Sequence, residues 1–420
     1  MRVAIVGNFP KPFGGVATTC FYLTEQLTLS GHEVVFFDRS AHKEKIVPGG
    51  ITEYFVVRKF SLTRLIFSVL LTPIQCISDK RLRILLPKIT KVLLEKRPFR
   101  KNLRNSLQIL LNIFKLIEIF KKDEIDVMHG HHASPETLCL MYFANYYLEC
   151  PFVVTVYASE FTMAEKAMWK SDAVKVCRES DGVMCISNFT RGQMLEAGAD
   201  PRNNFVVHLG VAREHFASTK PEKSDDVIYR YGLENRQNLI LYVGWLTERK
   251  GPQILVESLS QLSNFDWSAF LIGPDHGIKE ELEKNVSHLE LSDRIKILGE
   301  IPYPDLMAFY NLASIFVFPT LSEDEGFGLV ALEAMAHGLP VIASNTGAIP
   351  EVVIEDKSGL LIAPGDHAAL AAHLQLLICD KELHSEMSKK AKNVAKEFTW
   401  KRTTEQVMNL YQTAIQNYDS

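Results

Sequence analysis

Short apolar segments alternate with loops and longer amphipathic segments along most of this chain, and this alternation restricts the fold more than any other feature. Apolar runs bounded by turn residues are typical of strands buried in a parallel sheet. Strands that alternate with helices predict βαβ units and a doubly wound α/β fold. The expected strands are 3–6, 33–38, 125–128, 151–156, 182–186 and 206–210 in the first half, and 238–244, 269–273, 295–299, 315–319, 341–344 and 359–363 in the second.

A length of 420 residues predicts two domains, each large enough to bury its own core. We expect the first domain over 1–218 and the second over 227–395, with the polar stretch 219–226 as a linker. A final helical segment, 396–420, is expected to cross back to the first domain. Ligands of open α/β sheets bind beyond the carboxyl ends of the strands, so the loops there are the candidate sites.

Composition excludes several classes of protein. A formal net charge of −4 argues against a nucleic-acid partner. Seven scattered cysteines without close pairs indicate free thiols in a reducing cytoplasm. The chain opens directly with a strand and has no uninterrupted apolar run of about 18 residues, so we expect neither a signal peptide nor a transmembrane helix.

Residues 58–122 interrupt the alternation with a basic, apolar and helical segment. Sixteen Lys and Arg stand against three Asp and Glu, a net charge of +13. Two apolar rows repeat there at helical spacing. They are Leu103, Leu107, Leu110, Phe114 and Ile117, and Ile109, Ile113, Leu116 and Phe120. Two interpretations remain open: attachment to an anionic membrane surface, or a helical subdomain packed on the first domain with a solvated basic rim.

The stretch 325–333, Glu-Gly-Phe-Gly-Leu-Val-Ala-Leu-Glu, places two carboxylates eight positions apart, between an expected strand and an expected helix. Gly326 and Gly328 would let backbone amides approach a ligand closely, and a helix N-terminus favours a phosphate. Glu325 and Glu333 would then accept hydrogen bonds from hydroxyls on either side of the phosphates. This arrangement suits a nucleotide-sugar, although two acids alone would suit an ordinary surface loop and helix face.

Residues 314–351 are similar to the donor-site signature of glycosyltransferase family 4, the retaining enzymes of the GT-B fold. The similarity extends over roughly 1–40 and 123–400, and leaves out the basic insert. It implies an α/β architecture of two Rossmann-like doubly wound domains that face each other across a cleft. It also implies retaining transfer of a sugar from a UDP- or GDP-sugar to a hydroxyl acceptor, without a cofactor or a metal.

The resemblance also assigns roles to single residues. It implies that Glu333 accepts from ribose hydroxyls, that Lys250 and the amides near Gly328 hold the diphosphate, and that Glu325 contacts sugar hydroxyls. His131 matches a histidine near the transferred sugar, so Glu325, His131 and Lys250 form the expected catalytic set. The expected donor-binding set is Gly14, Gly15, Arg249, Lys250, Gly326, Phe327, Gly328, Leu329 and Glu333.

Three positions depart from the family pattern. Trp245 stands where many members carry arginine, so either one donor cation is missing or Arg249 supplies it from another angle. Tyr157 and Glu160 replace the His and Asp of a Thr-x-His-Gly-x-Asp turn on the acceptor side. The histidine run 129–132 invites a metal interpretation. We expect no metal there, because no acid or thiol ligand stands at a usual spacing, and we expect His129 and His132 to be structural.

The resemblance therefore implies a hexosyltransferase of polysaccharide, lipopolysaccharide or glycolipid synthesis. Its expected partners are a nucleotide-sugar donor, a sugar or lipid-linked acceptor, and an anionic membrane surface bound through 58–122 on the cytoplasmic side. Two alternatives remain: a sugar-nucleotide 2-epimerase of the same fold, and a non-catalytic nucleotide-sugar-binding protein. The intact Glu325, Glu333 and Lys250 argue against the second alternative.

Overall fold

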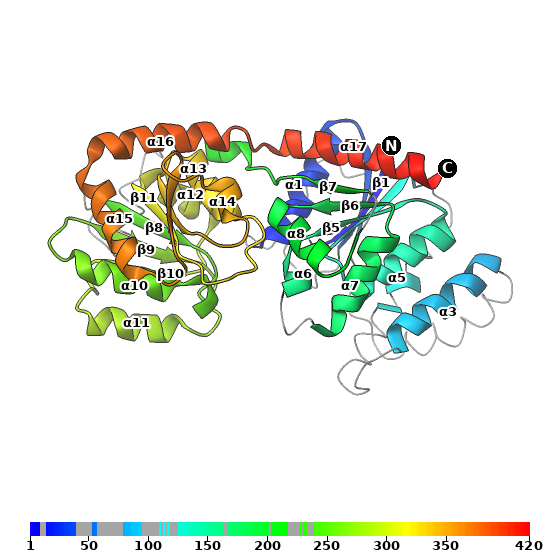
Figure 1. Ribbon diagram of the computed structural model, residues 1–420, viewed down its shortest axis with the longest axis horizontal. Coiled ribbons are helices and arrows are strands. Elements are labelled where there is room, and N and C mark those ends of the chain that lie inside the picture. Colours follow the sequence, from blue (N-terminus) through cyan, green and yellow to red (C-terminus); the bar gives the residue numbers. More distant parts are fainter. Residues whose placement is uncertain are drawn as a thin grey trace. The chain divides into compact units, whose positions relative to one another are not determined.

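The computed structural model describes residues 1–8, 14–38, 53–56, 79–94, 109–110, 112–114, 116–117, 125–162, 167–200, 203–216, 227, 230–232 and 238–420. The chain forms two compact units (Figure 1). The first unit comprises Met1–His208 and Trp400–Ser420, and the second comprises Leu209–Thr399. The division falls after His208, whereas we expected it after 218, and the expected linker 219–226 lies outside the described residues. Helix α17 (Trp400–Tyr418) belongs to the first unit.

The first unit has a seven-stranded sheet in the order β3-β2-β1-β4-β5-β6-β7, and every neighbouring pair is parallel. The strands are β1 (Arg2–Gly7), β2 (Glu33–Asp38), β3 (Glu53–Val56), β4 (Val127–His131), β5 (Phe152–Val156), β6 (Gly182–Cys185) and β7 (Asn204–Val206). Central strands such as β4 and β5 are buried along their whole length, as expected of a sheet with helices on both faces.

Three of these strands differ most from the sequence prediction: β3 is not among the predicted strands, and β4 and β7 have other bounds. β4 runs to His131, so His129 and His131 lie inside the strand and not in the loop after it. The ladder to β5 continues because Gly130 lets that strand pass close to Thr137 and Phe152, whose atoms a side-chain carbon would approach to 2.6 and 2.7 Å. The last strand is β7 at 204–206, where we expected 206–210.

The helices of the first unit are α1 (Gly15–Leu29), α3 (Lys80–Leu94), α5 (Pro135–Phe143), α6 (Ser159–Thr162), α7 (Ala167–Glu179), α8 (Asn188–Glu196) and α17, with a π-helical turn η1 (Ala144–Leu148) after α5. α17 packs against α1, β5 and β6. Its contacts include aromatic packing: the rings of Trp400 and Tyr22 stack with centroids 5.4 Å apart.

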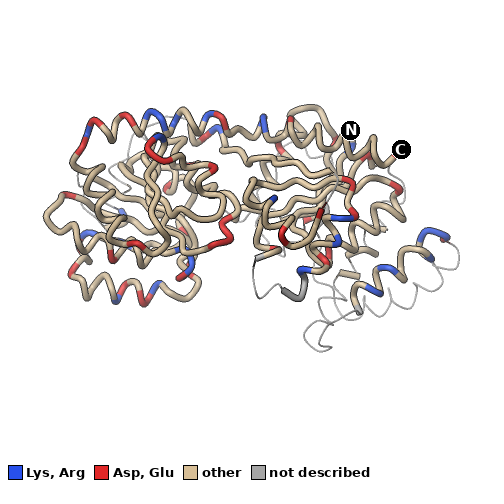
Figure 2. The backbone as a smooth tube through the Cα atoms, in the orientation of Figure 1, with Lys and Arg blue, Asp and Glu red and all other residues tan. Residues whose placement is uncertain are grey.

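The described part of the basic insert packs into the first unit. Helix α3 contacts α5 and η1, and its row Leu82, Leu85 and Ile89 is buried. Lys and Arg residues recur along this helix (Figure 2). Arg83 and Lys91 are exposed, whereas Lys88 lies over the rings of Tyr142 and Tyr146. The described members of the two predicted apolar rows, 109–110, 113–114 and 116–117, join the same core. These side chains therefore belong to a packed subdomain. Lys96 and the basic residues 97, 100, 101 and 104 lie outside the described residues.

The second unit has a six-stranded parallel sheet in the order β10-β9-β8-β11-β12-β13. The strands are β8 (Leu239–Val243), β9 (Ser268–Ile272), β10 (Ile295–Gly299), β11 (Ile315–Phe318), β12 (Val341–Ser344) and β13 (Gly359–Ile362). The helices are α10 (Pro252–Leu259), α11 (Lys279–His288), α12 (Tyr303–Leu312), α13 (Leu329–Ala336), α14 (Ile349–Val352), α15 (His367–Cys379) and α16 (Lys381–Ala395). The short helical turns are η3 (Arg213–Phe216), η4 (Glu248–Lys250) and η5 (Ser260–Leu262).

No helix among the described residues is both long and apolar enough to cross a membrane.

Candidate active site

The strand order of the second unit reverses direction between β8 and β11, and the loops after these two strands carry the predicted donor residues. Such a reversal leaves a crevice at the carboxyl edge of a parallel sheet, where ligands bind. The loop after β8 contains Arg249 and Lys250, and the loop after β11 contains Glu325, Gly326 and Gly328.

Two glycines allow close backbone contacts between these loops. A side-chain carbon at Gly251 would overlap the carbonyl oxygen of Pro319, and one at Gly347 would overlap that of Glu325. The amide of Ala348 donates to the same Glu325 oxygen at 2.8 Å. The loops after β8, β11 and β12 are therefore fixed relative to each other, and any larger residue at these glycines would displace the site.

Lys250 and Glu325 form an ion pair between these loops. Their side chains are only 16% and 14% exposed, so solvent screens the pair less than it would a surface pair. The Lys250 ammonium also lies 5.6 Å from the centre of the Phe318 ring. Lys250 sits in the turn η4, just before α10 begins at Pro252, as we expected of a cation at the head of a helix.

Arg249 is held by the loop after β11. Its guanidinium donates to Ser322 Oγ at 2.7 Å and to Asp324 Oδ1 at 3.0 Å. Its carbonyl oxygen accepts from the amide of Leu321 and the hydroxyl of Thr320. The side chain is 42% exposed, so it remains accessible beside Lys250. Two cations and two acids thus come together at this edge of the sheet.

Helix α13 begins directly after Gly328, whose φ of +88° favours glycine. No side chain caps this end, which leaves its first amides to another acceptor. Phe327 is buried, with its ring 6.0 Å from that of Phe398, so it can offer only its backbone to a ligand. Gly326 is buried and Leu329 is partly exposed in the same stretch.

Glu333 lies in the second turn of α13 and accepts a hydrogen bond from the Tyr310 hydroxyl at 3.0 Å. Burial raises the pKa of Glu333 to about 7, while the bond from Tyr310 acts in the opposite direction. Tyr310 is fully buried, and its ring stacks on His337 with centroids 5.2 Å apart. Because Tyr310 comes from α12, two helices fix the position of this carboxylate.

Beside Tyr310, two histidines contact each other. His215 Nδ1 and His337 Nε2 are 3.2 Å apart, and His337 Nδ1 lies 2.8 Å from Asn311 Oδ1. Burial lowers the pKa of His215 to about 4 and that of His337 to about 3, so both are neutral at neutral pH. The pair therefore adds no positive charge beside Tyr310, and the charge of Glu214 raises the pKa of Glu333 further.

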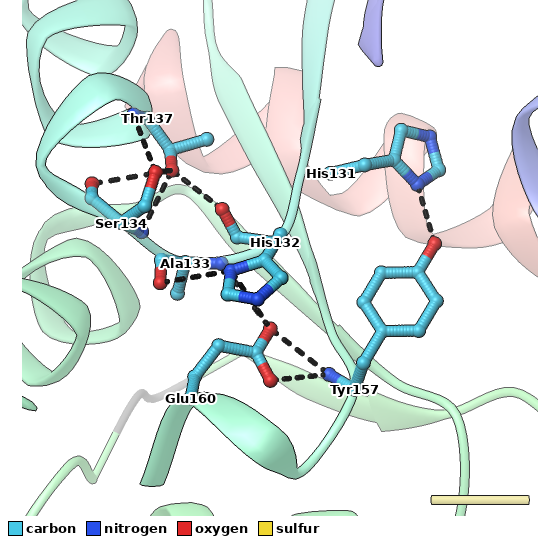
Figure 3. A network of polar contacts seen from close by, with 7 residues as sticks. All are labelled: His131, His132, Ala133, Ser134, Thr137, Tyr157 and Glu160. Carbon is cyan, nitrogen blue, oxygen red and sulfur yellow. Dashed lines mark hydrogen bonds and ion pairs between the residues drawn. The ribbon is translucent and has the colours of Figure 1, made fainter. Parts of the chain in front are cut away.

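His131, Tyr157 and Glu160 lie at or just beyond the carboxyl ends of β4 and β5 (Figure 3). His131 is buried, and its Nδ1 lies 2.8 Å from the Tyr157 hydroxyl. Its ring stacks on that of His129 with centroids 4.5 Å apart. Tyr157, which replaces the family histidine, therefore contacts the predicted catalytic histidine directly.

Glu160 joins the loops after these two strands (Figure 3). Its carboxylate accepts from the amide of Tyr157 at 3.1 and 3.0 Å and from that of Ala133 at 3.3 Å, and it lies 3.7 Å from His132 Nδ1. His132 and Ala158 both have positive φ, 72° and 76°, which is strained for residues other than glycine. The Glu160 bonds hold both loops in this conformation.

The three histidines of the run 129–132 have separate partners. His129 contacts the Tyr411 hydroxyl and the Thr155 hydroxyl, both at 2.7 Å, and burial lowers its pKa to about 3. His131 contacts Tyr157, as described above, and His132 contacts Glu160. Within the part of the chain that the structure describes, no group of three or more His, Cys, Asp or Glu side chains is placed to hold a metal ion.

Gly14 and Gly15 open α1 in the first unit. Gly14 has a φ of +139°, which favours glycine, and a side-chain carbon there would meet no atom of the described residues within 4 Å. The loop before it, 9–13, lies outside the described residues. Thus Lys250, Arg249, Glu325 and the glycines of 326–328 come together in the second unit, while Gly14, Gly15 and His131 belong to the first.

Two family models match the chain. Residues 13–215 match the model described as Glycosyltransferase Family 4, and residues 225–394 match the model described as Glycosyl transferases group 1. The chain belongs to glycosyltransferase family 4. Its two parallel α/β sheets with their helices are those of the GT-B fold, as the sequence predicted.

Known glycosyltransferases resemble this family member over much of its length. A glycosyltransferase of Methanocaldococcus jannaschii is 28% identical over 324 residues, which are 76% of this chain and 85% of that protein. A D-inositol 3-phosphate glycosyltransferase of Corynebacterium glutamicum is 30% identical over 261 residues, 59% of this chain and 62% of that relative. The structure of HepE from Anabaena in complex with UDP and glucose aligns over 97% of this chain and 98% of its own, with a TM-score of 0.71 and 18% identity, which supports the fold alone.

Sequence reasoning did not find the residues that support the site of this glycosyltransferase. Asp324 and Ser322 hold Arg249, Tyr310 holds Glu333, and His215 reaches His337 from 122 positions away in the sequence. Only Asp324 had a local signal, because it directly precedes Glu325. The others act through contacts between separate elements, which leave no pattern in the sequence.

Proposed function

We propose that this glycosyltransferase moves a hexose-type sugar from a UDP- or GDP-sugar to a hydroxyl, with retention at the anomeric carbon. The observation that carries the proposal is the Lys250–Glu325 pair beside the uncapped start of α13, at the strand-order reversal of the second unit. A cation, a helix N-terminus and a carboxylate at one place suit a diphosphate attached to a sugar.

In this proposal, Lys250 stabilises the diphosphate leaving group. Negative charge grows on that group as the bond to the sugar breaks, and a positioned cation stabilises the transition state more than the ground state. The amides at the start of α13 would bind the same phosphates. Arg249, held by Asp324 and Ser322, would supply a second cation in place of the arginine that Trp245 replaces.

Glu325 would accept from hydroxyls of the transferred sugar, since its carboxylate is already placed beside Lys250. Glu333 would accept from the ribose hydroxyls once it is ionised. His131 would contact the transferred sugar or the acceptor from the first unit, and Gly14 and Gly15 would contact the diphosphate. Attack of the acceptor on the same face as the departing diphosphate would give retention without a covalent intermediate.

The acceptor is proposed to be a sugar or a lipid-linked hydroxyl in polysaccharide, lipopolysaccharide or glycolipid synthesis. The D-inositol 3-phosphate glycosyltransferase among the relatives makes a polyol phosphate a further acceptor to test. A sugar-nucleotide 2-epimerase remains the alternative in the enzyme class, because it would use the same donor residues without an acceptor.

Labelled UDP- and GDP-sugars, incubated with the protein and a panel of hydroxyl acceptors, test the proposal. Transfer of label to an acceptor, with the α or β configuration of the donor kept in the product, is the expected result. Release of an isomerised sugar would favour the epimerase. Donor that binds and is recovered unchanged with every acceptor would favour a non-catalytic binding protein.

A further inference from the structure

Trp245 and His276 form an exposed aromatic stack in the second unit. Their ring centroids are 4.4 Å apart and their planes differ by 14°. Trp245 is 41% exposed, and His276 is exposed as well. Trp245 therefore presents accessible indole surface that a ligand could contact. Because the family position is often a cation, this stack is a feature of the present chain.

The backbone under the stack is held at several points. The amide of Leu246 donates to Pro274 O at 2.9 Å, and the amide of His276 donates to Leu246 O at 3.1 Å. The carboxylate of Asp275 accepts from three successive amides, 277–279, at 2.9 to 3.2 Å. The two rings therefore sit on a fixed turn, and binding to them would require little ordering of the backbone.

Trp245, one of the two stacked residues, lies in a loop of the proposed donor site. Trp245 shares the loop after β8 with Lys250, and its carbonyl oxygen accepts from the Tyr242 hydroxyl at 3.0 Å. Lys250 pairs in turn with Glu325, the proposed contact of the transferred sugar. Glu333, the proposed ribose contact, is instead bound by Tyr310 from α12.

We propose that the Trp245–His276 stack is a platform for the apolar face of a sugar ring beside Lys250 and Glu325. This rests on the proposed function. The C–H bonds on one face of a pyranose carry partial positive charge, and the face of an aromatic ring is negative, so the two attract each other. An arginine at position 245 would bind the diphosphate; Trp245 offers stacking in its place, and Lys250 and Arg249 retain the cationic role.

Binding measurements on the full chain separate the sugar from the nucleotide. Calorimetry would compare UDP- and GDP-sugars with free UDP and GDP, for the wild type, Trp245→Ala and Trp245→Phe. Leu376→Ala is the matched control, because Leu376 is also 41% exposed but lies on α15. If the platform holds the donor sugar, we expect Trp245→Ala to bind the nucleotide-sugar roughly three- to tenfold more weakly than the wild type. The affinity of this variant for free UDP or GDP should be unchanged. Trp245→Phe should bind the nucleotide-sugar almost as tightly as the wild type.

The acceptor sugar is the other source of the same chemistry. If donor affinity is unchanged but Trp245→Ala raises the KM of the acceptor several-fold, the platform holds the acceptor ring. An equal loss of affinity for free nucleotide would overturn the proposal in favour of base or phosphate contact. No change in any of these constants would overturn it as well. If the wild type binds no nucleotide-sugar at all, the proposed function fails and the platform fails with it.

Fluorescence gives an independent readout. Among the tryptophan side chains that the structure describes, Trp267 and Trp400 are buried and Trp245 is exposed, so a sugar placed on Trp245 should change the indole emission of the wild type. The change should disappear in Trp245→Phe at a donor concentration that still saturates the site. A change of the same size in Trp245→Phe would show that the indole signal comes from elsewhere and would count against the platform.

Discussion

The ionisation of Glu333 should make donor binding depend on pH. Burial raises its pKa to about 7, above the ordinary value of a glutamate, so below pH 7 the carboxyl is largely protonated in the ligand-free protein. Ribose hydroxyls donate to the ionised form and would lower that pKa. Donor binding at pH 6 should therefore release protons, and donor affinity should rise as the pH rises through 7.

Calorimetry in two buffers of different ionisation enthalpy measures these protons directly. The control is Glu333→Gln, which keeps the shape but cannot titrate, and which should bind donor more weakly without releasing protons. Losing one charged hydrogen-bond partner costs roughly 1.5–3 kcal/mol. Proton uptake by the wild type, or an affinity independent of pH between 6 and 8, would show that Glu333 does not meet the ribose.

Ala158 is a residue at which the chain stores strain. Its φ of 76° favours glycine, which the family pattern carries at this position. Ala158→Gly should therefore raise the free energy of unfolding by about 0.5–1 kcal/mol, since relief of strain outweighs the entropy that glycine adds to the unfolded chain. Urea unfolding measures this change.

Ala173→Gly is the matched control, because Ala173 is equally buried but lies inside helix α7. It should lower the free energy of unfolding by about 1 kcal/mol. If Ala158→Gly destabilises the protein as much as this control does, the turn at 158 is not strained.

At the scale of elements, α17 is bound to the first unit by a polar contact as well as by apolar packing. The Tyr411 hydroxyl meets His129 Nδ1 at 2.7 Å in a fully buried position. Tyr411→Phe would leave the histidine nitrogen without this partner, so we expect a loss of about 1–3 kcal/mol in the free energy of unfolding. Tyr418→Phe is the control: its hydroxyl makes a 3.4 Å contact with Asn145 O near the surface, and the loss should stay under about 0.5 kcal/mol. Equal losses would refute a specific role for the His129 contact.

Element by element, the sequence predicted what depends on local pattern. The alternation of buried strands and helices follows from apolar periodicity, and all six predicted strands of the second unit are present. The sequence prediction did not include β3. It also ended β4 too early, because two histidines in a row of alternating residues are not typical of a buried strand. In the site, Lys250 and Glu325 carry a family signature, whereas the partners Asp324 and Tyr310 depend on how loops and helices meet.

For the whole molecule, membrane attachment through the basic insert stays a prediction. The described apolar rows of the insert are packed in the first unit, so binding would have to rest mainly on charge. We expect the protein to float with anionic vesicles at low salt and to be released at high salt. Neutralising Lys96, Arg97, Arg100, Lys101 and Arg104 together should reduce flotation. If the protein remains with the soluble fraction at low salt, a soluble acceptor is the better proposal.

The central claim is that Lys250 acts on a departing nucleoside diphosphate. The most direct measurement is the single-turnover rate of sugar transfer from saturating donor, in the wild type and in Lys250→Ala, alongside the melting temperature of each. We predict that the rate falls by roughly 10²–10³-fold, since the lost charge matters most in the transition state, while the melting temperature changes little. A transfer rate that is unchanged, or that falls only as far as the folded fraction falls, would contradict the account.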